Sequence, residues 1–517
     1  MRGPVGALFA MLLTALVLGG AVPYGAGPGR AYLSYLVLAA REDAAGAARA
    51  AAESRAAGGR VVQEYPQIGA VLAYATDGFA DKVRARPGIA AVGATRTTPV
   101  VGPPRAVDGA GDFAAGRGRG RGRGRSEGSE GTEGVEARGS AEGDDRGSVE
   151  GVARRASDGR DGGTVTVPDP GEGGAWNLAA VHAGTGRPGD ATGGAPSAEA
   201  MRKVLVAVLD SGVDDTHPDL RAAVDPKASA SCADGRPDAR TGSWRPDPGV
   251  AESGHGTHVA GIIGAGGRAG QGVTGVAPGV RIAAVRLLGP LGQYYAENIV
   301  CGMLWAADHG AKAINDSYFA DPWKYNCPED RDQAALIAAV GRAVGYAQRK
   351  GAVVVASAGN DGQDLGAART DGRSPNDRVS GPAPTRHLGA ECIRLPGQLP
   401  GVVTVTAVNR DGRPSSYTNY GRGLVSLAAP GGDPDAGAQG AIVSDWPGGQ
   451  YAVLAGTSMA AAHVTGAVAV AAALHPDFGS ARLAELLAVT AAGACPAGAG
   501  GCGDRRVFGA GEVVLPR

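Results

Sequence analysis

From residue 204 onward, short apolar runs alternate with stretches that have the composition of helices, and this alternation constrains the fold more than any other feature. The runs cover residues 204–209, 281–287, 311–314, 352–356, 402–408 and 424–428. The helical stretches cover residues 257–264, 297–309, 332–349 and 458–474. Nearly continuous apolar strands separated by helices predict an α/β fold, with a mostly parallel sheet covered by helices on both faces. Reactive groups in such folds gather at the carboxyl ends of the strands, and Asp210 directly follows the first run.

A smaller patterned unit precedes this region, at residues 31–101. Apolar strands are expected at residues 32–39, 61–62, 70–74 and 89–92, and helices at residues 44–57 and 79–85. The order strand, helix, two strands, helix, strand predicts a small ferredoxin-like α+β domain.

Residues 102–174 lack any such pattern and read as a linker. Arg-Gly steps up to Arg125 are followed by a Ser/Glu/Gly-rich acidic stretch, which cannot bury enough apolar surface to offset the entropy of ordering the chain. We therefore expect disorder to about residue 174. Arg-Gly steps also occur in RNA-binding tracts, but the base-stacking aromatic residues of such tracts are missing here. The net charge of −1 gives no general attraction to nucleic acid or to acidic membranes.

The N-terminus predicts export from the cytoplasm. Arg2 precedes an apolar run at residues 7–18, and small residues follow it, as in a secretory signal peptide ending near residue 26. A membrane anchor is the alternative, but the run is shorter than the roughly 20 residues that span a bilayer. The mature protein is expected to be secreted, free of the membrane and monomeric.

Six cysteines, all after residue 200, fit an oxidising compartment. Spacing alone does not fix their pairing, although the short loop between Cys495 and Cys502 favours a local disulfide. Pairing the rest in chain order gives Cys232 with Cys301, and Cys327 with Cys392. Zinc is the competing interpretation, and no Cys-x-x-Cys pair supports it.

Three glycine-rich motifs carry the chemistry. Asp210 lies in Val-Leu-Asp-Ser-Gly, His255 in His-Gly-Thr-His-Val-Ala-Gly, and Ser458 in Gly-Thr-Ser-Met-Ala. A serine hydroxyl is a weak nucleophile that needs a base, and the base needs a group that orients it. Each residue taken singly is an ordinary turn or cap residue. Together they supply a nucleophile, a general base and an orienting carboxylate.

The order Asp, His, Ser, with these motifs, resembles the subtilase family of subtilisin-like serine peptidases. The resemblance is strong from residue 175 to residue 517 and implies a catalytic domain there. It is weaker over residues 31–101, where it implies a propeptide that assists folding and inhibits the enzyme as a zymogen. An unrelated small α+β domain remains the alternative for that unit.

The resemblance also assigns a fourth residue. In Ala-Ser-Ala-Gly-Asn-Asp-Gly, Asn360 matches the family asparagine whose side-chain amide points into the oxyanion hole. By chance alone Asn360 would be a turn residue. The same resemblance makes Ser357 and Gly359 part of the substrate-binding region.

Subtilases bind the substrate backbone between two exposed edges by strand addition. Leu288, Gly292 and Tyr294 match one edge, with Leu288 and Tyr294 as walls of the P2 and P4 sites. Ser317 and Phe319 lie on the other edge, where the sequence departs from the usual Ser-Leu-Gly-Gly. Phe319 would either line the S1 entrance or pack into a remodelled loop, so the P1 preference stays open.

Two further departures bear on the site. Asp316 stands where an apolar residue is usual, and Ala462 replaces the proline usually found before His463; we expect both to tune the site locally without touching the triad. Asp219 matches a family calcium ligand, but the loop at residues 264–272 carries Arg268 and lacks the expected asparagine. No metal or cofactor is assigned, although structural calcium is compatible with the family.

Three functions fit the sequence to different degrees. The first is a secreted serine endopeptidase acting on polypeptides, with its own propeptide as inhibitor. The second is a catalytically silent, subtilase-shaped binding protein in which the altered edge at residues 317–320 abolishes turnover. The third is RNA association through the Arg-Gly tract, which would be sensitive to salt.

Overall fold

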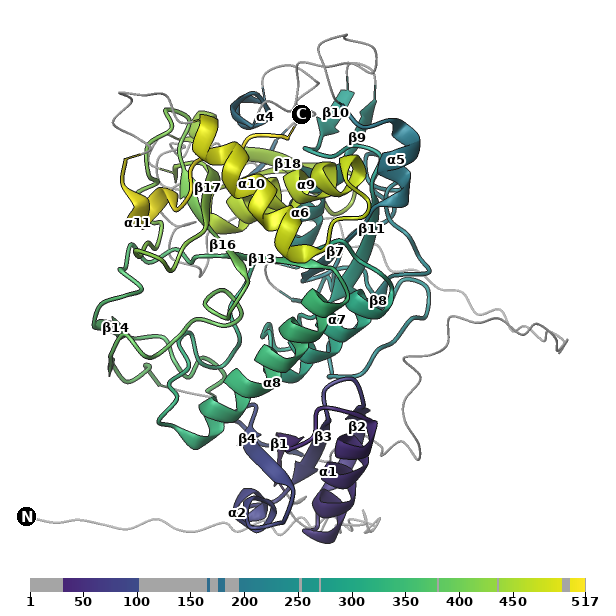
Figure 1. Cartoon of the computed structure of the whole chain (residues 1–517), viewed down its shortest axis with the longest axis vertical. Helices are drawn as coiled ribbons and strands as arrows, with labels where there is room; N and C mark the ends of the chain where they lie inside the picture. The colour runs from purple at the N-terminus through teal and green to yellow at the C-terminus, as the bar shows by residue number, and fades with distance from the viewer. Residues whose placement is uncertain are drawn as a thin grey trace, which may run out of the picture.

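The computed structural model of the chain describes residues 31–101, 165–167, 175–181, 195–250, 253–268, 271–378, 381–434, 437–494 and 503–516. These residues form a large unit built on a parallel sheet and a small N-terminal unit beneath it (Figure 1). The expected signal segment, most of the expected linker, and Cys495 with Cys502 lie outside the described residues.

The small unit has the predicted ferredoxin-like arrangement. Its main elements are β1 (Ala31–Ala39), α1 (Ala44–Ala56), β2 (Arg60–Tyr65), β3 (Ala70–Ala75), α2 (Phe79–Arg84) and β4 (Ile89–Ala94). The antiparallel strand order is β2-β3-β1-β4, and the short β5 (Val100–Val101) pairs with the start of β1. The carboxylate of Asp43 caps α1 by accepting from the Gly46 N–H at 2.8 Å.

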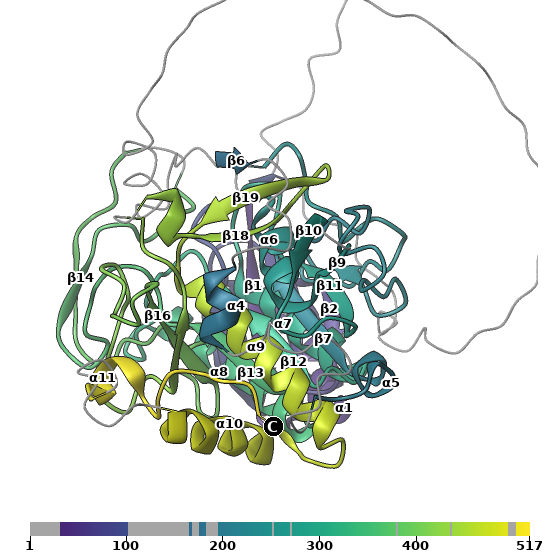
Figure 2. The same cartoon turned by 90° about the horizontal axis from the view of Figure 1, so that it is seen from above.

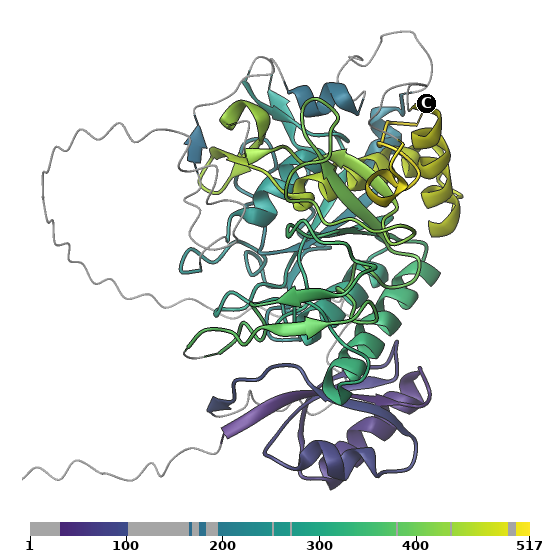
Figure 3. The same ribbon diagram turned by 90° about the vertical axis from the view of Figure 1, so that its left-hand side faces the viewer.

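The two faces of this small sheet pack against different partners. Side chains alternate along a strand, so Tyr35 and Val37 pack with residues of α1 and α2. Leu36 and Leu38 point the opposite way and belong to the same buried cluster as α7 (Ala296–Asp308) and α8 (Arg331–Arg349) of the large unit. The sheet of the small unit therefore lies against those two helices, as Figure 3 shows from the side.

The large unit contains the predicted parallel sheet. Its seven strands, in spatial order, are β17 (Leu427–Pro430), β16 (Val403–Val408), β13 (Val353–Ser357), β12 (Ala313–Asp316), β7 (Leu205–Asp210), β11 (Arg281–Arg286) and β8 (Ala230–Ser231). Every pairing between neighbours is parallel. The predicted apolar runs thus correspond to strands of one sheet.

Helices cover both faces of this sheet. Val206 and Val208 of β7 pack in one cluster with α6 (His255–Gly264) and α9 (Thr457–Leu474). Leu209, on the other face of β7, packs with α7 and α8. The predicted α/β fold with two helical layers is therefore confirmed.

Within the described part of the chain, α9 is the one helix long and apolar enough to cross a membrane. Of its 18-residue apolar window, 89% is buried inside the protein. Its apolar composition is explained by its place in the core, between the sheet and α6.

A small antiparallel sheet lies outside the main one (Figure 2). It consists of β18 (Ile442–Trp446), β19 (Gln450–Leu454) and β6 (Val165–Val167). The strand β6 comes from the segment expected to be disordered up to about residue 174. The partner strand β19, which leads directly toward Ser458, provides the hydrogen bonds that order these three residues.

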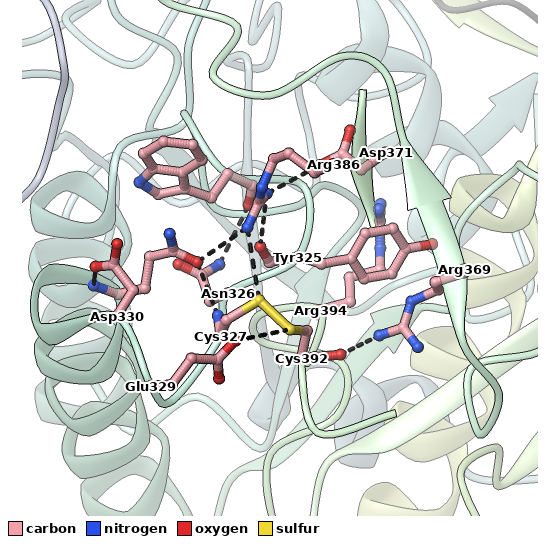
Figure 4. Close-up of a disulfide and its surroundings, with 12 residues drawn as sticks. Tyr325, Asn326, Cys327, Glu329, Asp330, Arg369, Asp371, Arg386, Cys392 and Arg394 are labelled. Atoms are coloured by element: carbon pink, nitrogen blue, oxygen red, sulfur yellow. Dashed lines mark hydrogen bonds and ion pairs between the residues drawn. A yellow bond between two sulfur atoms is a disulfide. The ribbon is translucent and has the colours of Figure 1, made fainter. Parts of the chain in front are cut away.

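Two disulfides join distant parts of the large unit. Cys232 bonds to Cys301 of α7, and Cys327 bonds to Cys392. Both pairings agree with the prediction from chain order. Figure 4 shows the second disulfide, around which Tyr325, Arg386 and Arg394 gather.

Candidate active site

Three neighbouring strands end in polar residues at one edge of the sheet. Ser357 ends β13, Asp316 ends β12 and Asp210 ends β7. All three are buried. Because the strands are parallel and adjacent, their carboxyl ends bring these side chains to the region where α6 and α9 begin.

Asp210 and His255 are in direct contact. The Nδ1 of His255 lies 2.8 Å from Asp210 Oδ1, which also accepts from the Ser211 backbone N–H at 2.6 Å. The carboxylate is fully buried, whereas the His255 side chain is 21% exposed. A hydrogen bond from Nδ1–H to an ionised Asp210 leaves Nε2 of a neutral imidazole as the proton acceptor.

A glycine makes this close approach feasible. A Cβ at position 256 would lie 2.4 Å from the Gly212 carbonyl oxygen and 3.0 Å from Asp210 Cβ. Gly256 therefore lets the first turn of α6, which starts at His255, pack against the end of β7.

Ser458 lies in the first turn of α9 and is bonded to the end of β12. Its Oγ donates to the Ser317 carbonyl oxygen at 3.2 Å, and the Ser317 hydroxyl donates to the Ser458 carbonyl oxygen at 3.1 Å. The first turn of a helix carries backbone N–H groups without intrahelical partners, at the positive end of the dipole. The serine is thus held where backbone N–H groups favour a developing negative charge.

Asn360 is fixed by its carbonyl oxygen. Its Oδ1 accepts from the Thr457 backbone N–H at 2.9 Å and from the Thr457 hydroxyl at 2.7 Å. A Cβ at Gly456 would be 3.3 Å from Asn360 Nδ2, so the amide nitrogen lies beside the turn that leads into Ser458. With Oδ1 committed to α9, the NH₂ group is left to serve as a donor next to the serine.

The side chain of Tyr294, predicted as a wall of the P4 site, reaches Asp210 and the ring of Tyr318. Its hydroxyl donates to Asp210 Oδ1 at 3.3 Å, and its ring stacks on that of Tyr318 with centroids 4.9 Å apart. The Tyr318 hydroxyl in turn donates to Asp316 Oδ1 at 2.6 Å. Asp316 is therefore linked to Asp210 only indirectly, through the stacked rings of Tyr318 and Tyr294, and makes no direct contact with Asp210, His255 or Ser458 among the described residues.

Burial raises the pKa of Asp316 to about 7; the Tyr318 hydrogen bond opposes this rise, and the nearby negative charge of Asp210 adds a smaller one. A carboxyl with a raised pKa thus lies one strand away from Asp210. The sequence showed that Asp316 is unusual, but its spatial link to Asp210 depends on the strand order.

The other predicted substrate-binding residues fall into two groups. Leu288 is buried, and Gly292 lies in an exposed turn with φ of 78° that a side chain would strain. Phe319 and Gly359 both lie next to Arg394, whose guanidinium is 4.9 Å from the Phe319 ring centroid. A Cβ at Gly359 would be 3.2 Å from Arg394 Cζ. Arg394 was not predicted from the sequence. The one feature that could have indicated it is a basic residue within an apolar segment.

The family profile described as the subtilase family, Peptidase S8, matches residues 201–511. The chain belongs to the subtilase family. The match covers more than half of the chain and includes Asp210, His255, Asn360 and Ser458.

Curated subtilases are similar over part of their length. Fervidolysin of Fervidobacterium pennivorans is 32% identical over 56% of this chain and 37% of its own length. M-protease of Shouchella clausii is 30% identical over 60% of this chain and 62% of its own length. Subtilisin Savinase of Lederbergia lenta is 31% identical over 56% of this chain and 83% of its own length. This subtilase therefore spans about a third to two thirds of the first two relatives.

A solved structure shares the fold over nearly the whole chain. The epidermin leader peptide processing serine protease of Staphylococcus aureus superposes with a TM-score of 0.60 at 20% identity. The superposition covers 94% of this subtilase and 97% of that protein. The likeness extends the agreement in fold beyond the residues that the family profile matches.

One buried group in the described part of this subtilase has the composition of a metal site. His217, Asp219 and Asp445 offer ligand atoms within 4.8 Å of one another. Asp219 Oδ2 is already engaged by the Tyr451 hydroxyl at 3.0 Å and the Val273 N–H at 3.0 Å. Calcium prefers six to eight oxygen ligands, and a histidine with two buried carboxyls does not match that preference. We assign no metal here.

Proposed function

We propose that this subtilase is a serine endopeptidase that hydrolyses peptide bonds through an acyl-enzyme on Ser458. The contact between Asp210 and His255 is the observation that supports this most strongly. Asp210 lies at the end of β7, and Ser317, which bonds Ser458, directly follows the neighbouring strand β12. The starts of α6 and α9 are therefore held at adjacent strand ends.

The proposed reaction begins when Ser458 Oγ leaves its hydrogen bond to Ser317. Oγ attacks the carbonyl carbon of the substrate while His255 Nε2 takes its proton. Asp210 stabilises the imidazolium through Nδ1–H. The tetrahedral oxyanion accepts from Asn360 Nδ2 and from the backbone N–H of Ser458.

Collapse of this intermediate breaks the peptide C–N bond. His255 gives its proton to the departing amine, which leaves an ester on Ser458. Water then attacks the ester, with His255 again taking a proton. The same base returns a proton to Oγ, which restores the serine and releases the carboxylic acid product.

We also propose that residues 31–101 act as a propeptide that blocks the site. The segment after β4 contacts the large unit closely: Arg96 pairs with the buried Glu297 at 2.6 Å, and the Thr97 N–H donates to Asp377 at 2.7 Å. The residue before Asp377, Asn376, donates to Asp321 Oδ1 at 2.6 Å. Asp321 Oδ2 in turn accepts from the Tyr294 N–H at 2.6 Å, so the segment docks close to a residue that bonds Asp210.

Fluorophosphonate labelling tests the hydrolase proposal directly. An activated serine reacts with the probe, so we expect labelling of the matured wild type and none of Ser458→Ala. Loss of the base in His255→Ala should also abolish labelling. A folded, matured wild type that neither reacts with the probe nor cleaves casein would support the silent binding protein instead.

Secretion and maturation are tested on the same material. Export with the proposed processing predicts that mass spectrometry of the culture medium finds a product starting after residue 101. Full-length protein confined to the cell would contradict it. In Ser458→Ala, self-cleavage should be absent and residues 31–101 should stay attached.

A further inference from the structure

Arg394 carries a buried positive charge with no partner among the described residues. The residue is 6% exposed, and its Nε is enclosed without a hydrogen bond. None of the described residues forms a hydrogen bond or an ion pair with its guanidinium. Burial accordingly lowers the pKa of Arg394. Enclosing a cation in this way is unfavourable, so the arrangement calls for a ligand that pairs with it.

The guanidinium lies between the two segments that flank Ser458. On one side it lies over the ring of Phe319, two residues after Ser317, whose carbonyl oxygen accepts from Ser458 Oγ. On the other side it lies against Gly359, whose N–H donates to the Thr457 hydroxyl at 3.1 Å. Gly359 also directly precedes Asn360.

This position is next to the carbonyl that Ser458 attacks. In the proposed reaction the oxygen of that carbonyl points to Asn360, which leaves the space between the segments that carry Phe319 and Gly359 for the side chain of the same substrate residue. Arg394 lies in that space. Its Nε is enclosed by the protein, so the terminal nitrogens are the donors for an incoming group.

The nearby carboxylates are already engaged. Asp361 forms an ion pair with Lys324, and Asp321 accepts from Tyr294 and Asn376. The charges of Asp361 and Asp321 act on Arg394 from a distance, but neither carboxylate forms a hydrogen bond or an ion pair with its guanidinium in the described part of the chain. A substrate carboxylate that reached the guanidinium would therefore be its first direct ionic partner there.

We propose that Arg394 is a specificity-determining residue that selects a glutamate or aspartate side chain at the residue whose carbonyl Ser458 attacks. A guanidinium binds a carboxylate through paired charge-assisted hydrogen bonds, which a neutral amide does not match. The inference rests on the proposed peptidase function and adds to it the chemical class of the preferred substrate.

Cleavage of matched peptides by the matured wild type tests the inference without any mutation. Fluorogenic peptides that differ only at this position would carry Glu, Gln, Asp, Asn, Leu or Lys. We expect kcat/KM for Glu to exceed that for Gln by about tenfold to a hundredfold, the range of a charged hydrogen bond. Equal rates for Glu and Gln, or a preference for Leu or Lys, would overturn the inference.

Variants of Arg394 test whether the preference for Glu depends on this side chain. Arg394→Gln should bring the Glu to Gln ratio close to one, and Arg394→Lys should retain part of it. Because this ratio is measured within one preparation, it does not depend on how much of the variant folds. Arg386→Gln is the matched control: Arg386 belongs to the same disulfide region but pairs with Asp371, so the ratio should persist. If the Glu to Gln ratio of kcat/KM is unchanged in Arg394→Gln, the selectivity arises from other residues and the inference is overturned.

Fluorophosphonate labelling separates the two proposals. If the wild type does not react with the fluorophosphonate, the hydrolase proposal fails, and the inference about Arg394 fails with it. A wild type that labels and cleaves peptides without favouring acidic residues contradicts the role of Arg394 alone.

Discussion

The hydroxyl of Tyr294 donates to Asp210 Oδ1, the same carboxylate oxygen that faces His255 Nδ1. The two distances are 3.3 Å and 2.8 Å, so the histidine makes the shorter contact. Asp210 Oδ2 is buried without a partner in the described part of the chain. The hydrogen bonds to the Asp210 carboxylate from the described residues therefore converge on one oxygen, and Tyr294 helps to set its orientation.

This relationship predicts a loss of activity on removal of a single oxygen atom. Tyr294→Phe keeps the ring that stacks on Tyr318 and deletes only the donor to Asp210. We expect kcat/KM to fall about twofold to tenfold, the cost of one ordinary hydrogen bond, and to fall equally for all peptide substrates. Steady-state kinetics on the matched peptides measures this. If Tyr294 is only a wall of the P4 site, Tyr294→Phe will be fully active and Tyr294→Ala will lose selectivity instead.

Asp316 predicts a pH-dependent stability. Its carboxyl has a pKa raised by burial to about 7, so the folded state favours the protonated form. For a raised carboxyl pKa, the favourable contribution is complete at acid pH and is lost as the pH rises toward and through 7. A shift of about three units corresponds to at most about 4 kcal/mol of unfolding free energy.

Asp316→Asn removes this titration and keeps an oxygen for the Tyr318 hydroxyl. Relative to the wild type, the variant should gain stability between pH 5 and pH 8, measured as the difference in thermal midpoint in a Ser458→Ala background. Asp308→Asn, at an exposed carboxylate, is the control and should show no such trend. A constant difference across the pH range would show that Asp316 titrates as an ordinary carboxyl.

Asn360 allows the oxyanion role to be separated from a structural one. Its Oδ1 holds Thr457, and its Nδ2 is the proposed oxyanion donor. Asn360→Asp keeps the acceptor and deletes the donor, whereas Asn360→Ala deletes both. Both variants should lose about 10² to 10³ in turnover with little change in KM, the size known for loss of this donor in subtilisin. Turnover of Asn360→Asp close to that of the wild type would rule out Nδ2 as a donor to the transition state.

The fold could be predicted because its signals are local. The run at residues 204–209 is apolar throughout, as a strand buried on both faces requires, and Ser458 precedes a long apolar stretch that forms the core helix α9. The apolar run that forms β1 likewise predicted the first strand of the small unit. The three motif residues could be picked out because each lies in a short glycine-rich segment.

The links between motifs could not be predicted, because they depend on spatial neighbours. Asp316 reaches Asp210 only through two tyrosines that come together when β12 pairs with β7. Arg394 lies far from Phe319 along the chain and reaches it in the folded protein, two residues beyond the Cys327–Cys392 disulfide. Spacing in the sequence carries no information about such contacts. The strand β6 was missed for the same reason, since its partner β19 is remote in sequence.

The buried pair between Arg96 and Glu297 predicts how firmly the N-terminal unit is held. Glu297 is fully enclosed, Arg96 is 11% exposed, and the Arg96 guanidinium also lies 4.2 Å from the Tyr295 ring centroid. Removing one partner of a buried pair leaves the other charge uncompensated, which costs about 3 to 5 kcal/mol. Arg96→Met in the Ser458→Ala full-length protein should therefore release residues 31–101 to limited proteolysis and lower the denaturation midpoint.

The double variant Arg96→Met with Glu297→Leu distinguishes loss of the pair from loss of packing. It replaces both charges by apolar groups, so most of the lost stability should return. Arg41→Gln, which breaks an exposed pair with Asp43, is the control and should leave the unfolding free energy nearly unchanged. If Arg96→Met is as stable as the control, then docking of the N-terminal unit depends on the apolar contacts of Leu36 and Leu38 with α7 and α8, and the ion pair contributes only to orientation.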